Sequence, residues 1–283
     1  MIIWIASYPK SGNTWIRSLI SSYLFSKDGV FNFDLLNHIE QFSSSHLIKN
    51  DIKKTHYQDI ISKNWIPSQK LINKDKKIRF YKTHNAMCSI NGNYFTDKEN
   101  TLAAIYIVRD PRNLVLSLSH HYQLDFEKSF IFLSNKRKII FPVNINDNTK
   151  DPEDFNFLSD WSTHYNSWKN IKFCPIKIIK YEDIVKDPKK NFISVLNFLS
   201  NFIKIDIDER KIKNCLKTTD FNSLSKLENK QGFIESVSST KNQKKIKFFN
   251  KGKKNDWKKL LNNKIAKKIE NTFNSEMKEL NYL

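Results

Sequence analysis

One stretch near the start of the sequence decides the fold: Trp4-Ile5-Ala6-Ser7-Tyr8-Pro9-Lys10-Ser11-Gly12-Asn13-Thr14-Trp15. The apolar residues 2–6 predict a short buried strand. Pro9 ends that strand, because proline cannot donate to a sheet ladder. After a small polar turn, apolar side chains at helical spacing predict a helix over residues 15–24. The sequence therefore begins with a strand, a tight turn and a helix.

This turn has the composition of an anion-binding loop. A helix start directs free backbone N–H groups at an anion, and Gly12 lets the backbone approach closely. Lys10 adds a full positive charge, and three further side chains add hydrogen-bond donors: Ser11, Asn13 and Thr14. A plain strand-to-helix turn, with Asn13 or Thr14 capping the helix, is the alternative. The ATP-type phosphate loop is absent, because the lysine precedes the glycine.

Composition limits the class of protein. The chain has 283 residues, 39% of them hydrophobic, and can bury a sizeable core. Its three cysteines lie far apart, which favours a reducing compartment over a disulfide framework or a metal cluster. The N-terminal apolar stretch is too short for a signal peptide or a membrane span. We expect a cytoplasmic protein without a metal and without a membrane-spanning segment.

The formal net charge of +19 suggests a nucleic-acid-binding protein. However, the excess is lysine, spread along the chain beside many Asn and Ile residues. Arginine, the better reader of phosphates and base edges, is scarce. We therefore expect a general preference for anionic ligands and no nucleic-acid partner.

The remaining pattern alternates strands and helices. Further strands are predicted at residues 78–84, 102–108 and 176–181, and helices at residues 110–121, 161–168, 191–202 and 256–280. Such alternation predicts an α/β domain with a mainly parallel sheet. Short amphipathic helices on the surface are expected at 31–42 and 52–61. Residues 122–157 mix aromatic and lysine side chains and predict an insertion or lid, and residues 228–255 predict a mobile loop.

The first stretch resembles the 5′-phosphosulfate loop of the cytosolic-type sulfotransferases. These enzymes use 3′-phosphoadenosine 5′-phosphosulfate (PAPS). The segment Tyr106-Ile107-Val108-Arg109-Asp110-Pro111-Arg112-Asn113, followed by Ser117, resembles the family's 3′-phosphate motif. An arginine at a strand end offers a bidentate fork to a phosphate, and a helix serine adds a hydroxyl donor. Pairing of Arg109 with Asp110 or Asp125 is the alternative.

A second group of residues resembles the catalytic segment of the family. Tyr81-Lys82-Thr83-His84 is similar to the segment that carries the catalytic base, which makes His84 the base and Lys82 an assistant at the sulfonate. An imidazole titrates near neutral pH and suits proton abstraction from a hydroxyl. The resemblance gives Lys10 the role of neutralising charge on the bridging and leaving oxygens. The other histidines are expected to be structural.

Two further segments resemble the family's adenine site. Lys180-Tyr181-Glu182-Asp183 places Tyr181 by the adenine, and Thr219-Asp220-Phe221 supplies the Thr and Phe that hold the ring. Trp15 belongs to the same predicted cofactor site. Phe221 and Trp15 could instead be ordinary core aromatics.

The last matching segment is Phe249-Asn250-Lys251-Gly252-Lys253-Lys254-Asn255-Asp256-Trp257-Lys258, which resembles the family's closing motif. Asn250, Lys251 and Gly252 are its predicted cofactor contacts. Asn250 replaces an arginine that grips the 3′-phosphate, and Asn255 replaces a glycine. Asn262 and Asn263 stand where the Thr-Val of the vertebrate dimer signature is expected, so that dimer is not supported.

The resemblance implies a single P-loop-like α/β domain over residues 1–283, with an acceptor lid at 122–157 and a cofactor-covering loop at 228–255. It also implies a PAPS-dependent sulfotransferase that acts on a hydroxyl, or an amine, of a small molecule or glycan. Two alternatives remain open. A P-loop nucleoside or nucleotide kinase would need Mg²⁺, and a basic nucleic-acid-binding protein would show a steep dependence on salt.

Overall fold

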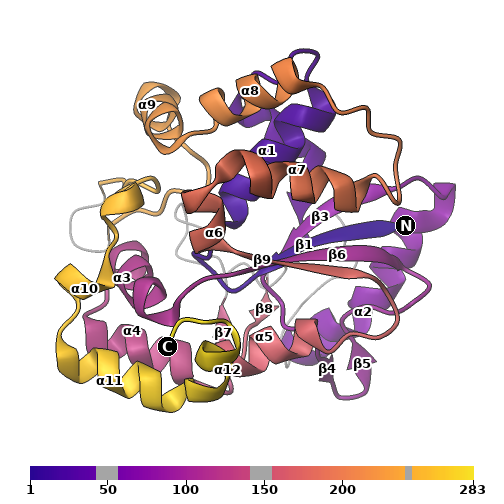
Figure 1. The fold of residues 1–283 in the computed structure, drawn as a ribbon. Helices are drawn as coiled ribbons and strands as arrows, with labels where there is room; N and C mark the ends of the chain where they lie inside the picture. Colours follow the sequence, from indigo (N-terminus) through magenta and orange to yellow (C-terminus); the bar gives the residue numbers. More distant parts are fainter. Residues whose placement is uncertain (43–56, 141–154, 240–243) are drawn as a thin grey trace. The chain divides into compact units, whose positions relative to one another are not determined.

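The computed structural model describes residues 1–42, 57–140, 155–239 and 244–283 (Figure 1). The strands are β1 (Ile2–Ser7), β2 (Ile39–Gln41), β3 (Arg79–Thr83), β4 (Ser89–Ile90), β5 (Asn93–Tyr94), β6 (Thr101–Val108), β7 (Ile139–Ile140), β8 (Asn156–Phe157) and β9 (Ile176–Lys180). The α-helices are α1 (Asn13–Phe25), α2 (Tyr57–Ile72), α3 (Pro111–Tyr122), α4 (Phe126–Ser134), α5 (Trp161–Lys169), α6 (Tyr181–Lys186), α7 (Pro188–Leu199), α8 (Glu209–Thr218), α9 (Phe221–Gln231), α10 (Trp257–Leu260), α11 (Asn263–Thr272) and α12 (Asn274–Glu279). Short 3₁₀ helices are η1 (Phe33–His38), η3 (Asn73–Asp75) and η5 (Gly252–Lys254).

The chain divides into two units. The first unit comprises Met1–Tyr8, Ile39–Val108 and Ser134–Ile178. The second unit comprises Pro9–His38, Arg109–Leu133 and Ile179–Leu283. Each unit is described separately below.

A five-stranded sheet organises the first unit, in the order β2-β3-β1-β6-β9. β1 pairs in parallel with β3 and with β6, and β2 pairs in parallel with β3 (Figure 1). All six residues of β1 are buried, as expected for a central strand covered on both faces. The prediction of an α/β fold with a mainly parallel sheet is confirmed.

Aromatic side chains form much of the core of this unit. The indole N–H of Trp4 donates a 2.9 Å hydrogen bond to Thr101 Oγ1, and its ring packs edge-on against Phe42. Trp65 of α2 and Trp168 of α5 both contact Phe95, with ring centroids 5.4 and 6.2 Å apart. These contacts fix α2 and α5 beside the sheet, because aromatic rings bury large apolar areas.

Several helices of the second unit begin at side chains that cap their free N–H groups. Asp110 accepts from Arg112 N before α3, and Pro111 occupies the first position of that helix. Asp187 and Asp208 start α7 and α8 in the same way, and Asp220 starts α9. The start of α3 agrees with its prediction from the sequence, whereas the helices α8 and α9 were not predicted.

The C-terminal segment differs from its prediction. Residues 256–280 form three helices, α10, α11 and α12, where one helix is expected. The break after α10 has a local cause: Asn262 Oδ1 accepts from Ile265 N at 2.9 Å and starts a new helix. Asparagine side chains compete with the helical backbone in this way.

Two loop predictions are only partly described. Of residues 228–255, the first four belong to α9, and both Phe233 and Phe249 are buried. Of residues 122–157, the described part contains α4, β7 and β8, and 141–154 lie outside the described residues. The segment 31–42 forms η1 and β2 where an amphipathic helix is expected. Among the described residues, none of the helices combines the length and apolar character needed to cross a bilayer.

Candidate active site

The loop before α1 has a strained backbone that only certain residues tolerate. Lys10 and Gly12 both have positive φ, at 67° and 101°. A Cβ at Gly12 would lie 2.4 Å from Cδ2 of Tyr181, so the ring of Tyr181 occupies the space that glycine leaves. Gly12 occupies the N-cap position of α1, and no side chain caps the helix there. The alternative role of Asn13 or Thr14 as a helix cap is therefore not observed.

Lys10 lies among groups of the second unit. Its Nζ is 3.5 Å from the ring centroid of Phe248, a cation–π arrangement. The same Nζ is 3.5 Å from Nδ1 of His121 on α3. The sequence does not distinguish His121 from the other histidines, so this neighbour of Lys10 was not predicted.

Arg109 joins the two phosphate motifs. One of its NH groups donates to the carbonyl oxygen of Lys10 at 2.9 Å and to Ser117 Oγ at 3.2 Å. Its guanidinium also stacks 4.2 Å above the ring of Tyr181. Among the described residues, Arg109 forms no ion pair, and it is Arg112 that binds the Asp110 carboxylate. The alternative pairing of Arg109 with Asp110 or Asp125 is not observed.

Ser11 Oγ and Arg109 Nε are both buried and have no hydrogen-bond partner among the described residues. Burying such a group costs free energy unless something binds to it. Both belong to the predicted phosphate motifs, and both are suited to donate to an anion. The residues present therefore fit an anionic ligand at this loop.

The closing motif reaches the same place. Asn255 Nδ2 donates to Ser117 Oγ at 3.3 Å and to the carbonyl of Asn113 at 3.2 Å. Trp257 N donates to Asn113 Oδ1 at 3.0 Å. Asn255, which stands where the resembled motif has a glycine, thus contacts Ser117, a residue predicted to bind the 3′-phosphate. Asn250 and Lys251 are exposed.

The predicted adenine residues cluster in the second unit. The rings of Trp15 and Tyr181 lie 6.0 Å apart, edge to face. Trp15 and Phe221 both pack against one apolar cluster, formed by Phe31, Leu36, Leu224, Phe233 and Phe249. A Cβ at Gly252 would lie 2.7 Å from the ring of Phe221, which explains the glycine there. Thr219 is fully buried, and its hydroxyl donates to the Cys215 carbonyl at 2.8 Å.

The carboxylate of Glu235 accepts hydrogen bonds from two side chains at the start of α1. Glu235 Oε2 accepts from the Thr14 hydroxyl at 2.8 Å, and Oε1 accepts from Arg17 at 2.6 Å. Another carboxylate, that of Glu228, is buried and accepts from Ser236 Oγ and from two backbone N–H groups, those of Phe248 and Phe249. Glu235 therefore joins its own segment to α1, and Glu228 joins Ser236, Phe248 and Phe249 to α9.

His84 and Lys82 belong to the first unit. His84 Nδ1 lies 2.8 Å from the carbonyl oxygen of Ser7, and its backbone N–H donates to Asn156 Oδ1 at 3.3 Å. His164 Nε2 donates to the carbonyl oxygen of His84 at 3.0 Å. Three groups therefore fix the backbone and the ring of His84. Lys82 is buried within β3.

His164 is a buried, neutral support for His84. Its Nδ1 lies 2.8 Å from the Tyr106 hydroxyl, which donates to it. Burial lowers the pKa of His164 from 6.5 to about 4, and its hydrogen bond to the His84 carbonyl opposes that shift. The buried imidazole of His164 is thus neutral and donates to the backbone of His84. The structural role expected for this histidine agrees with its contacts.

The predicted residues fall into two groups. Those of the anion loop, the 3′-phosphate motif, the adenine segments and the closing motif lie in the second unit, and His84 and Lys82 lie in the first. Sequence reasoning missed Glu228, Glu235, His121 and Tyr282. No motif marks these residues, because their contacts form only when separate segments of the chain pack together.

The family model described as "Sulfotransferase domain" matches residues 2–281 of this chain. The match covers both units and all of the predicted site residues.

Individual proteins of known name share less than 30% sequence identity with this chain in the comparisons below. Cytosolic sulfotransferase 13 of Arabidopsis thaliana is 23% identical over 274 residues, which covers 95% of this chain and 75% of the relative. Luciferin sulfotransferase of Photinus pyralis is 28% identical over 251 residues, covering 83% and 60%. A mouse sulfotransferase solved in complex with PAP shares the fold, with a TM-score of 0.57 and 19% identity over 98% of this chain and 84% of that chain.

Proposed function

Because the chain belongs to the sulfotransferase family, we propose that it transfers the sulfonate group of PAPS to an acceptor hydroxyl. The observation that carries this proposal is the contact between two motifs far apart in the sequence. Arg109 donates both to the Lys10 carbonyl of the anion loop and to Ser117. One guanidinium thus links the loop proposed for the 5′-phosphosulfate with the residues proposed for the 3′-phosphate.

The proposed cofactor contacts follow the motifs. Residues 10–14 hold the 5′-phosphosulfate, Arg109 and Ser117 hold the 3′-phosphate, and the rings of Trp15, Tyr181 and Phe221 flank the adenine. The unpartnered Ser11 Oγ and Arg109 Nε support this assignment, since both need an anion or a water to satisfy them. Ser117 Oγ already accepts from Arg109 and from Asn255, so its proton is the part of the hydroxyl suited to a phosphate. Thr219 supports the adenine site through its bond to the backbone.

His84 is the proposed general base. Donation from Nδ1 to the Ser7 carbonyl selects the neutral tautomer whose lone pair is on Nε2. Nε2 takes the proton of the acceptor hydroxyl while the acceptor oxygen forms a bond to sulfur. The bond between sulfur and the 5′-phosphate oxygen breaks in the same step, and PAP leaves. Lys10 stabilises the negative charge that develops on that oxygen, and Lys82 assists at the sulfonate.

The acceptor is proposed only by class. A small molecule with a hydroxyl is supported by the name of the Photinus relative, a luciferin sulfotransferase; an amine or a glycan hydroxyl is the less favoured possibility. The name of the Arabidopsis relative supports a cytoplasmic location. Residues 122–157 are proposed as an acceptor lid and residues 228–255 as a cofactor-covering loop, both within one sulfotransferase domain.

Asn250 and Lys251 complete the proposed site, and we expect them to bind the 3′-phosphate weakly. Asn250 carries no charge where the family has an arginine, and charge-assisted bonds are roughly twice as strong as neutral ones. Both side chains are exposed, so Arg109 and Ser117 carry most of the proposed 3′-phosphate binding.

The test is transfer of sulfur-35 from PAPS to a panel of phenols and aliphatic alcohols in the presence of EDTA. We expect labelled product and an equal amount of PAP, with no requirement for Mg²⁺. Thermal-shift measurements with PAP, ATP and GTP accompany the assay, since a ligand that binds only the folded state raises the melting temperature. Stabilisation by ATP with Mg²⁺, and none by PAP, would favour a kinase and overturn the proposal.

A further inference from the structure

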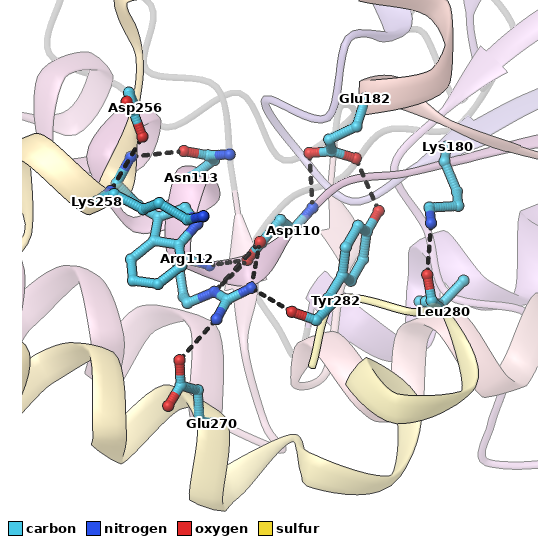
Figure 2. A network of polar contacts seen from close by, with 11 residues as sticks. Asp110, Arg112, Asn113, Lys180, Glu182, Asp256, Lys258, Glu270, Leu280 and Tyr282 are labelled. Carbon is cyan, nitrogen blue, oxygen red and sulfur yellow. Dashed lines mark hydrogen bonds and ion pairs between the residues drawn. The ribbon is translucent and has the colours of Figure 1, made fainter. Parts of the chain in front are cut away.

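A polar network fastens the last residues of the chain to the 3′-phosphate motif (Figure 2). Its centre is Arg112, whose guanidinium donates to the Asp110 carboxylate at 2.7 Å, to Glu270 at 2.6 Å and to the carbonyl oxygen of Tyr282 at 2.6 Å. Trp257 of the closing motif covers the same guanidinium at 3.9 Å. Tyr282 is thus held in place through its backbone.

The hydroxyl of Tyr282 meets a carboxylate next to the adenine segment. Tyr282 donates to Glu182 Oε2 at 2.8 Å, and the backbone N–H of Asp110 donates to Glu182 Oε1 at 3.1 Å (Figure 2). Both oxygens of this half-buried carboxylate are therefore engaged by residues other than Arg109.

Glu182 nevertheless lies within electrostatic reach of Arg109. Burial raises the pKa of Glu182, and the charge of Arg109 and the Tyr282 hydrogen bond oppose that rise. Arg109 itself donates only to neutral oxygens, those of Lys10 and Ser117, among the described residues. A carboxylate that turned onto this guanidinium would occupy the fork proposed for the phosphate.

We propose that Tyr282 is a positioning residue of the 3′-phosphate site, which holds the Glu182 carboxylate away from Arg109 and so leaves the guanidinium available to the phosphate. This inference rests on the proposed function. Burial and the neighbouring Glu182 charge raise the pKa of the Tyr282 phenol, so the phenol remains a donor at neutral pH. Lys180, whose Nζ lies 4.7 Å from the ring centroid of Tyr282, supports the ring in this position.

The test compares PAP with adenosine 5′-monophosphate (AMP), which lacks the 3′-phosphate, by calorimetric titration. We expect Tyr282→Phe to weaken PAP binding on the order of tenfold, the scale of one charge-assisted interaction, and to leave AMP binding unchanged. In Tyr282→Phe the Glu182 carboxylate can turn onto Arg109. Glu182→Gln removes the competing charge, so the double variant should bind PAP as tightly as Glu182→Gln alone.

Tyr23→Phe is the matched control, because its hydroxyl donates to the Asp206 carbonyl at 2.6 Å and accepts from Asp208 N at 2.9 Å, and neither partner belongs to the proposed nucleotide site. It should lower the melting temperature without changing the ratio of PAP to AMP affinity. Equal weakening of PAP and AMP by Tyr282→Phe, or no rescue by Glu182→Gln, would overturn the inference and leave Tyr282 as a structural brace. Failure of the unmodified chain to bind PAP would instead overturn the proposed function, and this inference with it.

Discussion

The Nδ1 atom of His84 lies 2.8 Å from the carbonyl oxygen of Ser7, the last residue of β1. A histidine held in this way presents its basic lone pair on Nε2. The same residue receives a hydrogen bond from buried His164 at its own carbonyl. The ring and the backbone of the proposed base are therefore fixed by two separate contacts.

His84→Ala should reduce sulfonate transfer on the order of 10²-fold or more, the scale of removing a general base, while the affinity for PAP stays unchanged. Steady-state transfer assays and PAP titrations measure the two quantities. His38→Ala, which removes an exposed histidine, is the control. Turnover close to normal in His84→Ala would exclude His84 as the base.

His164 predicts a dependence of stability on pH. Its pKa is lowered by burial to about 4 in the folded chain, against 6.5 when unfolded, so the unfolded state binds more protons between these values. Stability is fully present above about pH 6.5 and is lost as the pH falls toward 4, by on the order of 3 kcal/mol in total. Urea unfolding at several pH values measures this loss. His164→Gln should flatten the profile in this window, and an unchanged slope would contradict a neutral His164.

Lys10→Met should lower kcat more than it weakens PAP binding. The reason is that the lysine charge acts mainly on negative charge that develops in the transition state. Lys27→Met, at an exposed position of the second unit, controls for the loss of a positive charge. A large loss of PAP affinity with an unchanged kcat would mean that Lys10 binds the cofactor and is not a catalytic group.

Glu235→Gln should tighten the binding of PAP and AMP alike, by on the order of fivefold, because it removes a negative charge from the proposed 5′-phosphate donors. In the structure the Glu235 carboxylate accepts from Thr14 and Arg17, and a phosphate at the loop must compete with it. Glu209→Gln, in an exposed pair with Lys189, is the control. Weaker binding of both nucleotides would mean that Glu235 supports the loop.

Much of the fold could be predicted from local sequence. The continuous apolar run of β1 and the Asp110-Pro111 start of α3 both carry local signals, and both occur as expected. The C-terminal segment could not be predicted as three helices from its apolar spacing. There a single asparagine, Asn262, outweighs the periodicity by capping a new helix.

The site was predictable to the extent that its residues sit in motifs. Arg109 and Ser117 are hydrogen-bonded, as their spacing suggests. They are only eight positions apart, at the end of a strand and in the helix that follows it, so their contact depends on local structure. Glu235 and Tyr282 are different. Glu235 lies 221 positions from its partner Thr14, and Tyr282 lies 100 positions from its partner Glu182. Such single contacts leave no periodicity in the sequence, so only the folded chain reveals them.

The central claim is that the anion loop and Arg109 together bind an adenosine nucleotide through its 3′-phosphate. Calorimetric titration of the unmodified chain with PAP, AMP and ATP, in EDTA, tests it most directly. We predict that PAP binds at least about tenfold tighter than AMP or ATP, because only PAP reaches the charge-assisted donors of Arg109. AMP or ATP binding as tightly as PAP would contradict the claim.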